Sequence, residues 1–490
     1  MEWPWQRVKR LEEQVVQLQR IIAEQKAEIE RLRQLLEEAQ RASKRQAAPF
    51  SRRNPKAHPE KPGRKAGRQY GHACRRPIPE VIDQTVEAVL PDNCTCGGRV
   101  LETGIETQYQ TELPPPQVER IAFRIHVGRC EQCGRRVQGR HPRQTSNAVG
   151  AAASQLGPRA VAVATQLNKQ MGLSYGKTAS VLQELFGLPV SRGGLSQALE
   201  RVAKKSEPTY QKLIQEIRSS PNVTPDETGW KVGGKLWWMW AFSTASVTVY
   251  SIQPGRGFEQ AAAILGADYA GFLTRDGWIV YRFFVQAFHQ SCLSHLLRRC
   301  REMIAVARLG AAEFPRTVQE ILQDALNLRD RYQAGTVSEV GLAITLGKLE
   351  ARLDRALDKS YRWPANQRLA NHLLRERQAI FTFLYCPGLD ATNYRAEQAI
   401  RPMVVTRKVW GGNRTERGAQ TQSILVSLLQ TCRQQGRSAV PLLEQLLRSP
   451  NSEAIDLTAP DRSPHSQGFA LKVRPTLFTL RNDGFSVSRR

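Results

Sequence analysis

The sequence of 490 residues is poor in acidic residues and contains no long apolar run. No stretch reaches the roughly 18 apolar residues of a membrane span, and the charged N-terminal residues lack the apolar core of a signal peptide. Nine cysteines are too few for the disulfide framework of a secreted protein. These absences argue against a membrane-embedded or disulfide-linked protein, and we expect an intracellular one.

Basic residues dominate the charge of the chain. Lys and Arg total 71 against 45 for Asp and Glu, which leaves a net charge of +26. This excess suits an acidic polymer, with nucleic acid as the first candidate partner and an anionic membrane surface as the second. Hydrophobic residues make up 41% of the chain, which is enough for real cores, and the length predicts several domains.

Residues 1–45 carry apolar residues at alternating steps of three and four, interrupted only at Gln25. This period predicts a coiled coil (a leucine zipper) that pairs two copies of the chain; an amphipathic helix packed on its own protein is the alternative. Residues 46–78 are basic, contain proline and glycine, and lack a period. They fit a solvated linker or an arm that follows DNA phosphates, with Arg64, Lys65 and Arg68 as candidate contacts.

Two cysteine pairs lie in a region of short predicted strands, residues 79–145. The pairs are Cys94 with Cys96, and Cys130 with Cys133, each followed by glycine. Four thiolates on two tight turns can close the tetrahedral site of a structural zinc ion, as in a zinc ribbon. The first pair has only one intervening residue, so His141 is an alternative ligand. Four unrelated buried thiols are the plainer alternative.

Residues 150–210 are predicted to be helical. A helix over 174–186, a glycine-containing turn and a helix over 191–204 have the order of a helix-turn-helix. Ser191 is a suitable N-cap for the second helix. Any pair of packed helices produces this pattern, so DNA binding and simple packing both stay open.

Residues 220–295 alternate strands and helix in the order of a ribonuclease H-like α/β fold. We predict strands over 222–232, 236–244, 247–254 and 272–276, with a helix over 257–267. A charged helical insertion over 296–388 follows, and the helices of 389–447 complete the core of a multidomain protein. Residues 450–490 have no clear period and are predicted to form a disordered tail.

Three acidic residues stand where such a fold would gather them. Asp226 lies inside the first strand, Asp276 at the end of the fourth, and Glu397 on a later helix. Converging carboxylates repel one another unless cations neutralise them, and hard oxygen ligands select Mg²⁺ or Mn²⁺. Two such ions can activate a water or a sugar hydroxyl against a phosphodiester.

Each of these acids has a plainer alternative. The two aspartates suit turn capping, and Glu397 suits an ion pair with Arg401 one helical turn later. Glu227 points to the opposite face of the strand from Asp226, and physical reasoning alone does not choose between the two neighbours.

A series of motifs in the second half of the chain resembles the IS66 family of bacterial insertion-sequence transposases. They are Asp226-Glu-Thr-Gly-Trp, Asp276-Gly-Trp, Cys292-Leu-Ser-His295, Thr392-Asn393, Ala396-Glu397, Ala399-Ile-Arg401-Pro402, Arg407-Lys408, Gly418-Ala419 and Thr431-Cys-Arg433. The zipper, the basic stretch, the zinc region and the helical insertion fit the same family. The resemblance implies a DDE transposase with Asp226, Asp276 and Glu397 as metal-binding acids, which selects Asp226 over Glu227.

Further residues have candidate roles. Cys292 and His295 fit core packing better than metal binding. Arg401, Arg407 and Lys408 are candidates for phosphate contacts, and Trp410 is a candidate for stacking on an unpaired base.

The sequence therefore predicts a dimeric bacterial DNA transposase that acts on terminal inverted repeats and target DNA, with two Mg²⁺ ions and a structural zinc. The alternatives are a DNA-binding regulator without catalysis and a ribonuclease H-like nuclease that cuts without joining. The resemblance also suggests accessory proteins from the same element, and a location in the cytoplasm at the nucleoid.

Overall fold

The computed structural model describes residues 15, 17–25, 28–29, 32, 78–113, 115–150, 154–449 and 455–457. The chain divides into two compact units, Met1–Pro114 and Pro115–Arg490. None of the described helices combines the length and the apolar character needed to cross a membrane.

In the first unit, the described residues of the predicted coiled coil are helical. Their apolar side chains are about half exposed, from 42% at Ile21 to 57% at Leu18, so the described part of the chain leaves this stripe uncovered. Pairing of two copies through it stays a prediction. The basic segment 46–77, with Arg64, Lys65 and Arg68, lies outside the described residues.

The second unit begins with a short hairpin and a group of helices. β1 (Val127–Arg129) pairs antiparallel with β2 (Arg136–Gln138). The helices are α2 (Pro158–Thr165), the π-helix η3 (Gln166–Gln170), α3 (Tyr175–Phe186) and α4 (Arg192–Ser219). The hydroxyls of Ser174 and Ser191 accept backbone N–H groups and cap α3 and α4 as expected for these residues.

The predicted helix pair is therefore present, but its second helix is longer than predicted. α4 continues past residue 204 to Ser219, because Leu213, Ile214 and Ile217 extend its buried stripe into the main core. Pro208 lies inside the helix and does not end it.

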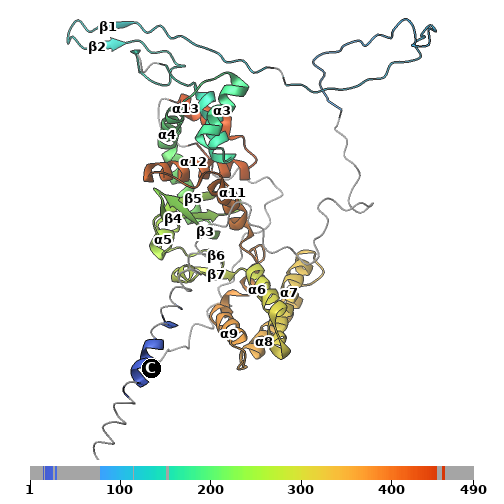
Figure 1. The fold of residues 1–490 in the computed structure, drawn as a ribbon, viewed down its shortest axis with the longest axis vertical. Helices are drawn as coiled ribbons and strands as arrows, with labels where there is room; N and C mark the ends of the chain where they lie inside the picture. The colour runs from blue at the N-terminus through green and yellow to red at the C-terminus, as the bar shows by residue number, and fades with distance from the viewer. Residues whose placement is uncertain are drawn as a thin grey trace, which may run out of the picture. The chain divides into compact units, whose positions relative to one another are not determined.

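A five-stranded mixed sheet forms the centre of the second unit (Figure 1). Its strands are β3 (Asn222–Val232), β4 (Lys235–Ser243), β5 (Thr248–Gln253), β6 (Phe272–Arg275) and β7 (Phe288–Ser291), in the order β5-β4-β3-β6-β7. β5, β4 and β3 are antiparallel neighbours, whereas β3, β6 and β7 run parallel. The first four strands agree with the prediction. The four-residue β7 was not predicted, because a run this short carries no readable alternation.

Helices cover both faces of this sheet. One face carries Trp230, Met239 and Ala241, which share a core with Ile400 and Met403 of α11 (Tyr394–Trp410). The other face carries Val223, Trp240 and Phe242, which share a core with α4 and with α5 (Phe258–Leu265). Alternate residues of β3 therefore face different helices.

Backbone N–H groups of the edge strand β5 donate to hydroxyl groups of α12 (Glu416–Gln434). Ser423, Ser427 and Thr431 recur every four residues and accept the backbone N–H groups of Ile252, Tyr250 and Thr248 at 3.0, 2.8 and 3.2 Å. These bonds occupy donors that an exposed edge would offer to another chain.

The helical insertion lies beside the β6–β7 edge and has its own core (Figure 1). Its helices are α6 (Leu293–Val306), η5 (Leu309–Ala312), α7 (Glu313–Gln333), α8 (Glu339–Leu357), α9 (Pro364–Glu376), η6 (Arg377–Ala379) and α10 (Thr382–Tyr385). Phe272 of β6 belongs to this core, so the insertion is joined directly to the sheet. A short helix, η4 (Ile279–Phe283), links β6 to β7, and α13 (Ala439–Arg448) packs on α2.

The predicted tail lies outside the described residues except for 455–457. There Leu457 is buried in the main core, and the Ile455 N–H donates to the Thr209 hydroxyl at 2.9 Å. This described segment is packed on α4, in contrast to the prediction for the tail.

Candidate active site

Asp226 lies on β3, and Asp276 directly follows its parallel neighbour β6. β3 and β6 run parallel, with Asn222 opposite Phe272 and Val223 opposite Leu273. Continuing this register brings Asp226 level with Asp276, which directly follows β6. One oxygen of each carboxylate accepts a backbone N–H at 2.9 Å, from Glu227 and from Trp278 respectively.

Glu397 approaches from the helix that covers the same face of the sheet. Glu397 lies in the first turn of α11. Trp230, four residues after Asp226 on β3, packs in the core that this helix shares with the sheet. Because side chains alternate along a strand, Asp226 and Trp230 point to the same face. The Glu397 side chain is 46% exposed, and its Oε1 lies 3.6 Å from His295 Nε2.

The surroundings of Asp226 disfavour the negatively charged form of its carboxyl group. Burial, followed by the negative charges of Glu227, Asp276 and Glu397, raises the pKa of Asp226 to about 7. The described residues contain no group of three or more His, Cys, Asp or Glu side chains drawn together closely enough to hold a metal ion. A divalent cation would offset this repulsion, and hard carboxylate oxygens are its preferred ligands, so the donor chemistry fits such an ion.

Glu227 is engaged on the opposite face of β3. Its Oε1 accepts from Arg256 Nε at 2.8 Å, and its Oε2 accepts the Tyr281 hydroxyl. The Arg256 guanidinium lies 3.7 Å from the ring centre of Trp278 and 4.6 Å from that of Trp238. These contacts occupy the Glu227 carboxylate and leave Asp226 as the acid on the side of α11.

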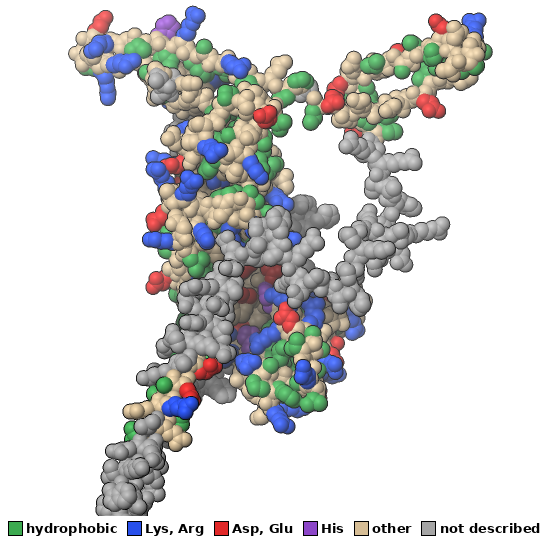
Figure 2. Space-filling view, viewed as in Figure 1, with side chains coloured by type: hydrophobic (Ala, Val, Ile, Leu, Met, Phe, Trp, Pro, Cys, Tyr) green, Lys and Arg blue, Asp and Glu red, His purple; other side chains and the backbone are tan. Residues whose placement is uncertain are grey.

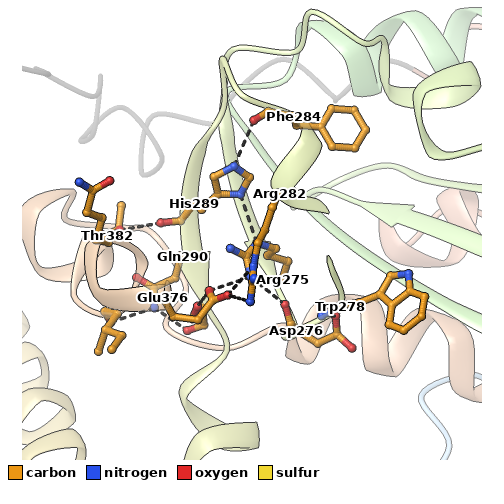
Figure 3. Close-up of polar contacts among 12 residues, drawn as sticks. Arg275, Asp276, Trp278, Arg282, Phe284, His289, Gln290, Glu376 and Thr382 are labelled. Atoms are coloured by element: carbon orange, nitrogen blue, oxygen red, sulfur yellow. Dashed lines mark hydrogen bonds and ion pairs between the residues drawn. The ribbon is translucent and has the colours of Figure 1, made fainter. Parts of the chain in front are cut away.

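A buried ion-pair network holds the segment before Asp276 (Figure 3). Arg275 and Glu376 have side chains that are 3% and 0% exposed, and Arg275 Nη1 lies 2.8 Å from Glu376 Oε2. Glu376 also binds Arg282, at 2.9 Å from its Nε, and accepts the Ser291 hydroxyl. Arg275 Nη1 donates to the Asp276 carbonyl at 3.0 Å. Glu376, the last residue of α9, thereby binds both β6 and β7 next to Asp276.

The pKa of Glu376 reflects these partners. Burial alone would raise the pKa of Glu376, but the charges of Arg275 and Arg282 and the Ser291 hydrogen bond outweigh burial, and the net shift is downward. Neither Glu376 nor Arg275 was singled out from the sequence, because nothing local distinguishes them from exposed charges on a helix and a strand.

Cys292 and His295 connect β7 to the helix of Glu397. Cys292 is 2% exposed, and its sulfur accepts the backbone N–H of Asn393, the N-cap of α11, at 3.3 Å. A hydrogen bond with Cys292 leads the effects that raise the pKa of His295. Cys292 therefore packs in the core as the sequence favoured, and it also helps place the start of α11.

The predicted DNA contacts after Glu397 separate into two groups. Arg401 and Lys408 are exposed. Arg407 donates to Thr228 Oγ1 at 3.1 Å and to the Gly229 carbonyl, so its guanidinium binds β3. Trp410 donates to the Gly172 carbonyl at 3.1 Å and packs edge-on against Trp230. These contacts give Arg407 and Trp410 roles within the protein, and their binding to DNA stays a prediction.

The two cysteine pairs sit on similar turns in different units. The Gly97 N–H donates to the Cys94 carbonyl and the Gly134 N–H to the Cys130 carbonyl, both at 2.8 Å. Both glycines have positive φ, 90° and 66°, which suits the tight turns. Hydrogen bonds from the backbone of Cys96 and of Cys133 are the largest effects that lower the pKa values of Cys94 and Cys130. Each turn thus favours a thiolate, and a shared zinc ion stays a prediction.

Comparison with known proteins defines the class of protein as a transposase. A family model described as "Transposase IS66 family" matches residues 153–421, more than half of the chain, including all three acids. The chain belongs to the IS66 transposase family. It is also 23% identical over 291 residues to "Uncharacterized protein y4qI" of Sinorhizobium fredii (strain NBRC 101917 / NGR234), and 53% of each chain is covered. The chain therefore spans about half the length of this curated relative.

Proposed function

We propose that this chain is a DDE transposase with a ribonuclease H-like core, which cuts DNA at the ends of its element and joins them to target DNA. The sheet order supports this fold, because three antiparallel strands precede two parallel ones on the far side of β3. The observation that carries the proposal is the parallel pairing of β3 with β6, whose register leads on to Asp226 and Asp276, together with a helix carrying Glu397 over the same face.

Asp226, Asp276 and Glu397 would hold Mg²⁺ or Mn²⁺. The bound ions would polarise the phosphodiester and favour deprotonation of the attacking oxygen. The chain's own residues place the ligands: the Arg275–Glu376 pair holds the end of β6, and Cys292 and His295 hold the start of α11 and Glu397.

The chemistry takes two balanced displacements at phosphorus. In the first, water attacks the phosphodiester at the element end, its P–O bond forms, and the 3′ oxygen leaves and takes up a proton as a free hydroxyl. In the second, this hydroxyl attacks a target phosphodiester, and the target's own 3′ oxygen leaves. The number of phosphodiester bonds is conserved in the second step, so it needs no external energy source.

Two copies of the chain would bring two element ends together. The half-exposed apolar stripe of residues 15–32 supports a coiled-coil dimer, since two such stripes can cover each other. In this proposal the basic arm, the zinc turns and the α3–α4 pair bind the terminal repeats, and proteins encoded by the same element assist.

The test is incubation of the purified protein with labelled element-end DNA and Mg²⁺. Asp226→Asn and Glu397→Gln are compared with Asp324→Asn, an exposed acid of the insertion that pairs with Arg352. We expect joined products with the wild type and the control variant, and none with the other two. Binding without cleavage, equal in all four proteins, would favour a regulator, and cleavage without joining would favour a nuclease.

A further inference from the structure

A cavity of about 330 Å³ is lined by Gly277, the residue that follows Asp276. Gly277 and Ser291, at the ends of β6 and β7, form one wall, and His295, Arg298 and Arg299 of α6 form another. His372 of α9 completes it from the insertion. Figure 2 shows a hollow at the level of these helices in which His, Asp or Glu, and Lys or Arg side chains gather. The cavity therefore opens between the sheet and the insertion. Its lining includes Gly277, which follows Asp276, and His295, whose Nε2 lies 3.6 Å from Glu397 Oε1.

α6 turns two arginines into the lining of this cavity, and α9 carries further arginines on either side of His372. On α6, His295, Arg298 and Arg299 are spaced three and four residues apart and share a face. On α9, Arg368 and Arg375 flank His372 at steps of four and three. The positive charges of Arg368 and Arg375 add to the effect of burial in lowering the pKa of Arg299, so the two helices bring these charges close together.

These arginines have no acidic partner in the described part of the chain. Among the described residues, no carboxylate lies within 4.0 Å of a guanidinium nitrogen of Arg298, Arg299, Arg368 or Arg375. By contrast, Arg275 and Arg282 are paired with Glu376, and Arg377 is paired with Glu350. Arg298 and Arg299 in the cavity lining are therefore not neutralised by a direct ion pair with a described residue, whereas the arginines bound to Glu376 and Glu350 are. Glu302 is the acid among the cavity's lining residues.

We propose that this cavity binds the phosphate backbone of the DNA strand next to the phosphodiester that is cut. Arginine forks match phosphate oxygens, and contacts to phosphates position a strand without reading its sequence. The volume suits one nucleotide unit better than a duplex, which places a single strand between α6 and α9. This inference rests on the proposed function, because it gives the strand a path to Asp276 and Glu397.

The test measures binding of the full chain to a fluorescent single-stranded DNA of mixed sequence over a series of salt concentrations. The cavity variant is Arg298→Gln with Arg299→Gln. The control is Arg316→Gln with Arg331→Gln, which removes two exposed charges of the insertion outside the cavity. Thermal unfolding of all three proteins checks that each is folded.

We expect the cavity variant to bind about tenfold or more weakly than the control. The plot of log affinity against log salt concentration should also become less steep, by about 1.4, because two phosphate contacts are lost and each contributes roughly 0.7 on a single strand. Equal affinities and equal slopes in the two variants overturn the inference while leaving the proposed function standing. No binding of DNA by the wild type at any salt concentration would count against both.

A competition with inorganic phosphate separates DNA from a small anion as the occupant. At constant ionic strength, phosphate should displace DNA no better than chloride does. Phosphate binding by the wild type that is absent in the cavity variant, with DNA binding unchanged by phosphate in both proteins, would show that the cavity is a site for a small phosphate. The inference would then be wrong.

Discussion

At the scale of residues, the proposed active site depends on charges that are buried away from the acids themselves. Arg275 precedes Asp276 in the chain, yet its partner Glu376 comes from the far end of the insertion. A buried ion pair adds little to stability as a whole, but removing one partner leaves the other charge uncompensated. The geometry of Asp276 is therefore sensitive to a side chain that never reaches the substrate.

Glu376→Gln should lower the free energy of unfolding by about 3–5 kcal/mol, because it leaves Arg275 and Arg282 without their shared carboxylate. Glu350→Gln is the control, since its partner Arg377 keeps a second partner in Asp354. That change should cost about 1 kcal/mol or less. Urea unfolding measures both, and equal losses would show that burial of the Arg275–Glu376 pair is energetically unimportant.

Gly412 fixes the chain after α11 against the end of β3. Its φ is 128°, and a Cβ there would clash with the Lys231 carbonyl oxygen. Asn413 donates to that same carbonyl at 2.8 Å and accepts from the Trp230 indole at 2.7 Å. No residue with a side chain fits at position 412 without moving this strand.

Gly412→Ala should therefore destabilise the protein by about 3 kcal/mol or more, through the clash added to backbone strain. Gly411→Ala tests the strain alone, because φ is 84° there and nothing lies within 4 Å of the added Cβ. It should cost about 1–2 kcal/mol. The measurement is thermal or urea unfolding of the two variants, and a Gly411 variant as unstable as the Gly412 variant would contradict the clash.

At the scale of elements, η3 places a lysine inside the protein. Lys169 is 1% exposed; its Nζ donates to Gln422 Oε1 at 2.7 Å and lies 5.4 and 5.8 Å from the ring centres of Tyr175 and Trp410. Burial lowers the pKa of Lys169 to about 7. The element that connects α2 to α3 is thus joined to α12 and to the end of α11 by one amine.

This burial makes stability depend on pH. In the unfolded chain Lys169 should titrate near 10.4, so between pH 7 and about 10 the unfolded state binds more protons and stability rises with pH. This contribution is absent in Lys169→Met. As pH rises, the free energy of unfolding of the wild type should therefore increase relative to that of the variant, by up to about 1.4 kcal/mol per pH unit. Urea unfolding at pH 7, 8 and 9 measures the trend. The exposed Lys177→Met is the control, and parallel pH profiles for wild type and Lys169→Met would refute the prediction.

At the scale of the whole molecule, the predicted zinc site depends on two separate cysteine pairs. Cys94 and Cys96 belong to the first unit, and Cys130 and Cys133 to the second. Four thiolates complete a structural zinc site.

The purified protein should contain about one zinc ion per chain. Cys130→Ser and Cys96→Ser should both lose it, because each removes one of four ligands, whereas Cys386→Ala, a buried thiol of the insertion core, should retain it. Metal analysis after dialysis decides the matter. Loss of zinc in only the Cys130 variant would point instead to a site within the second unit, with His141 as a candidate ligand.

The sequence alone determined the local elements of this protein. The bounds of β3 to β6, the cap at Ser191, and the helical character of the insertion follow from periodicity and from groups a few residues apart. The order of these elements, together with the motifs around Asp226, Asp276 and Glu397, led to the transposase family that the family model shows. Short-range interactions decide such features, so they can be read from a single chain.

Only the tertiary structure decided which charged side chains are paired and which are left open. In the folded chain, Glu227 binds Arg256 and Tyr281. Arg407 and Trp410 donate to carbonyl groups of the protein itself. Arg275 pairs with Glu376 of the insertion. The fold leaves Arg298 and Arg299 of α6, in the lining of a cavity, without a direct ion pair to any described residue. The pairing of a charge depends on residues far away in the sequence and on their burial, and no local pattern contains that information.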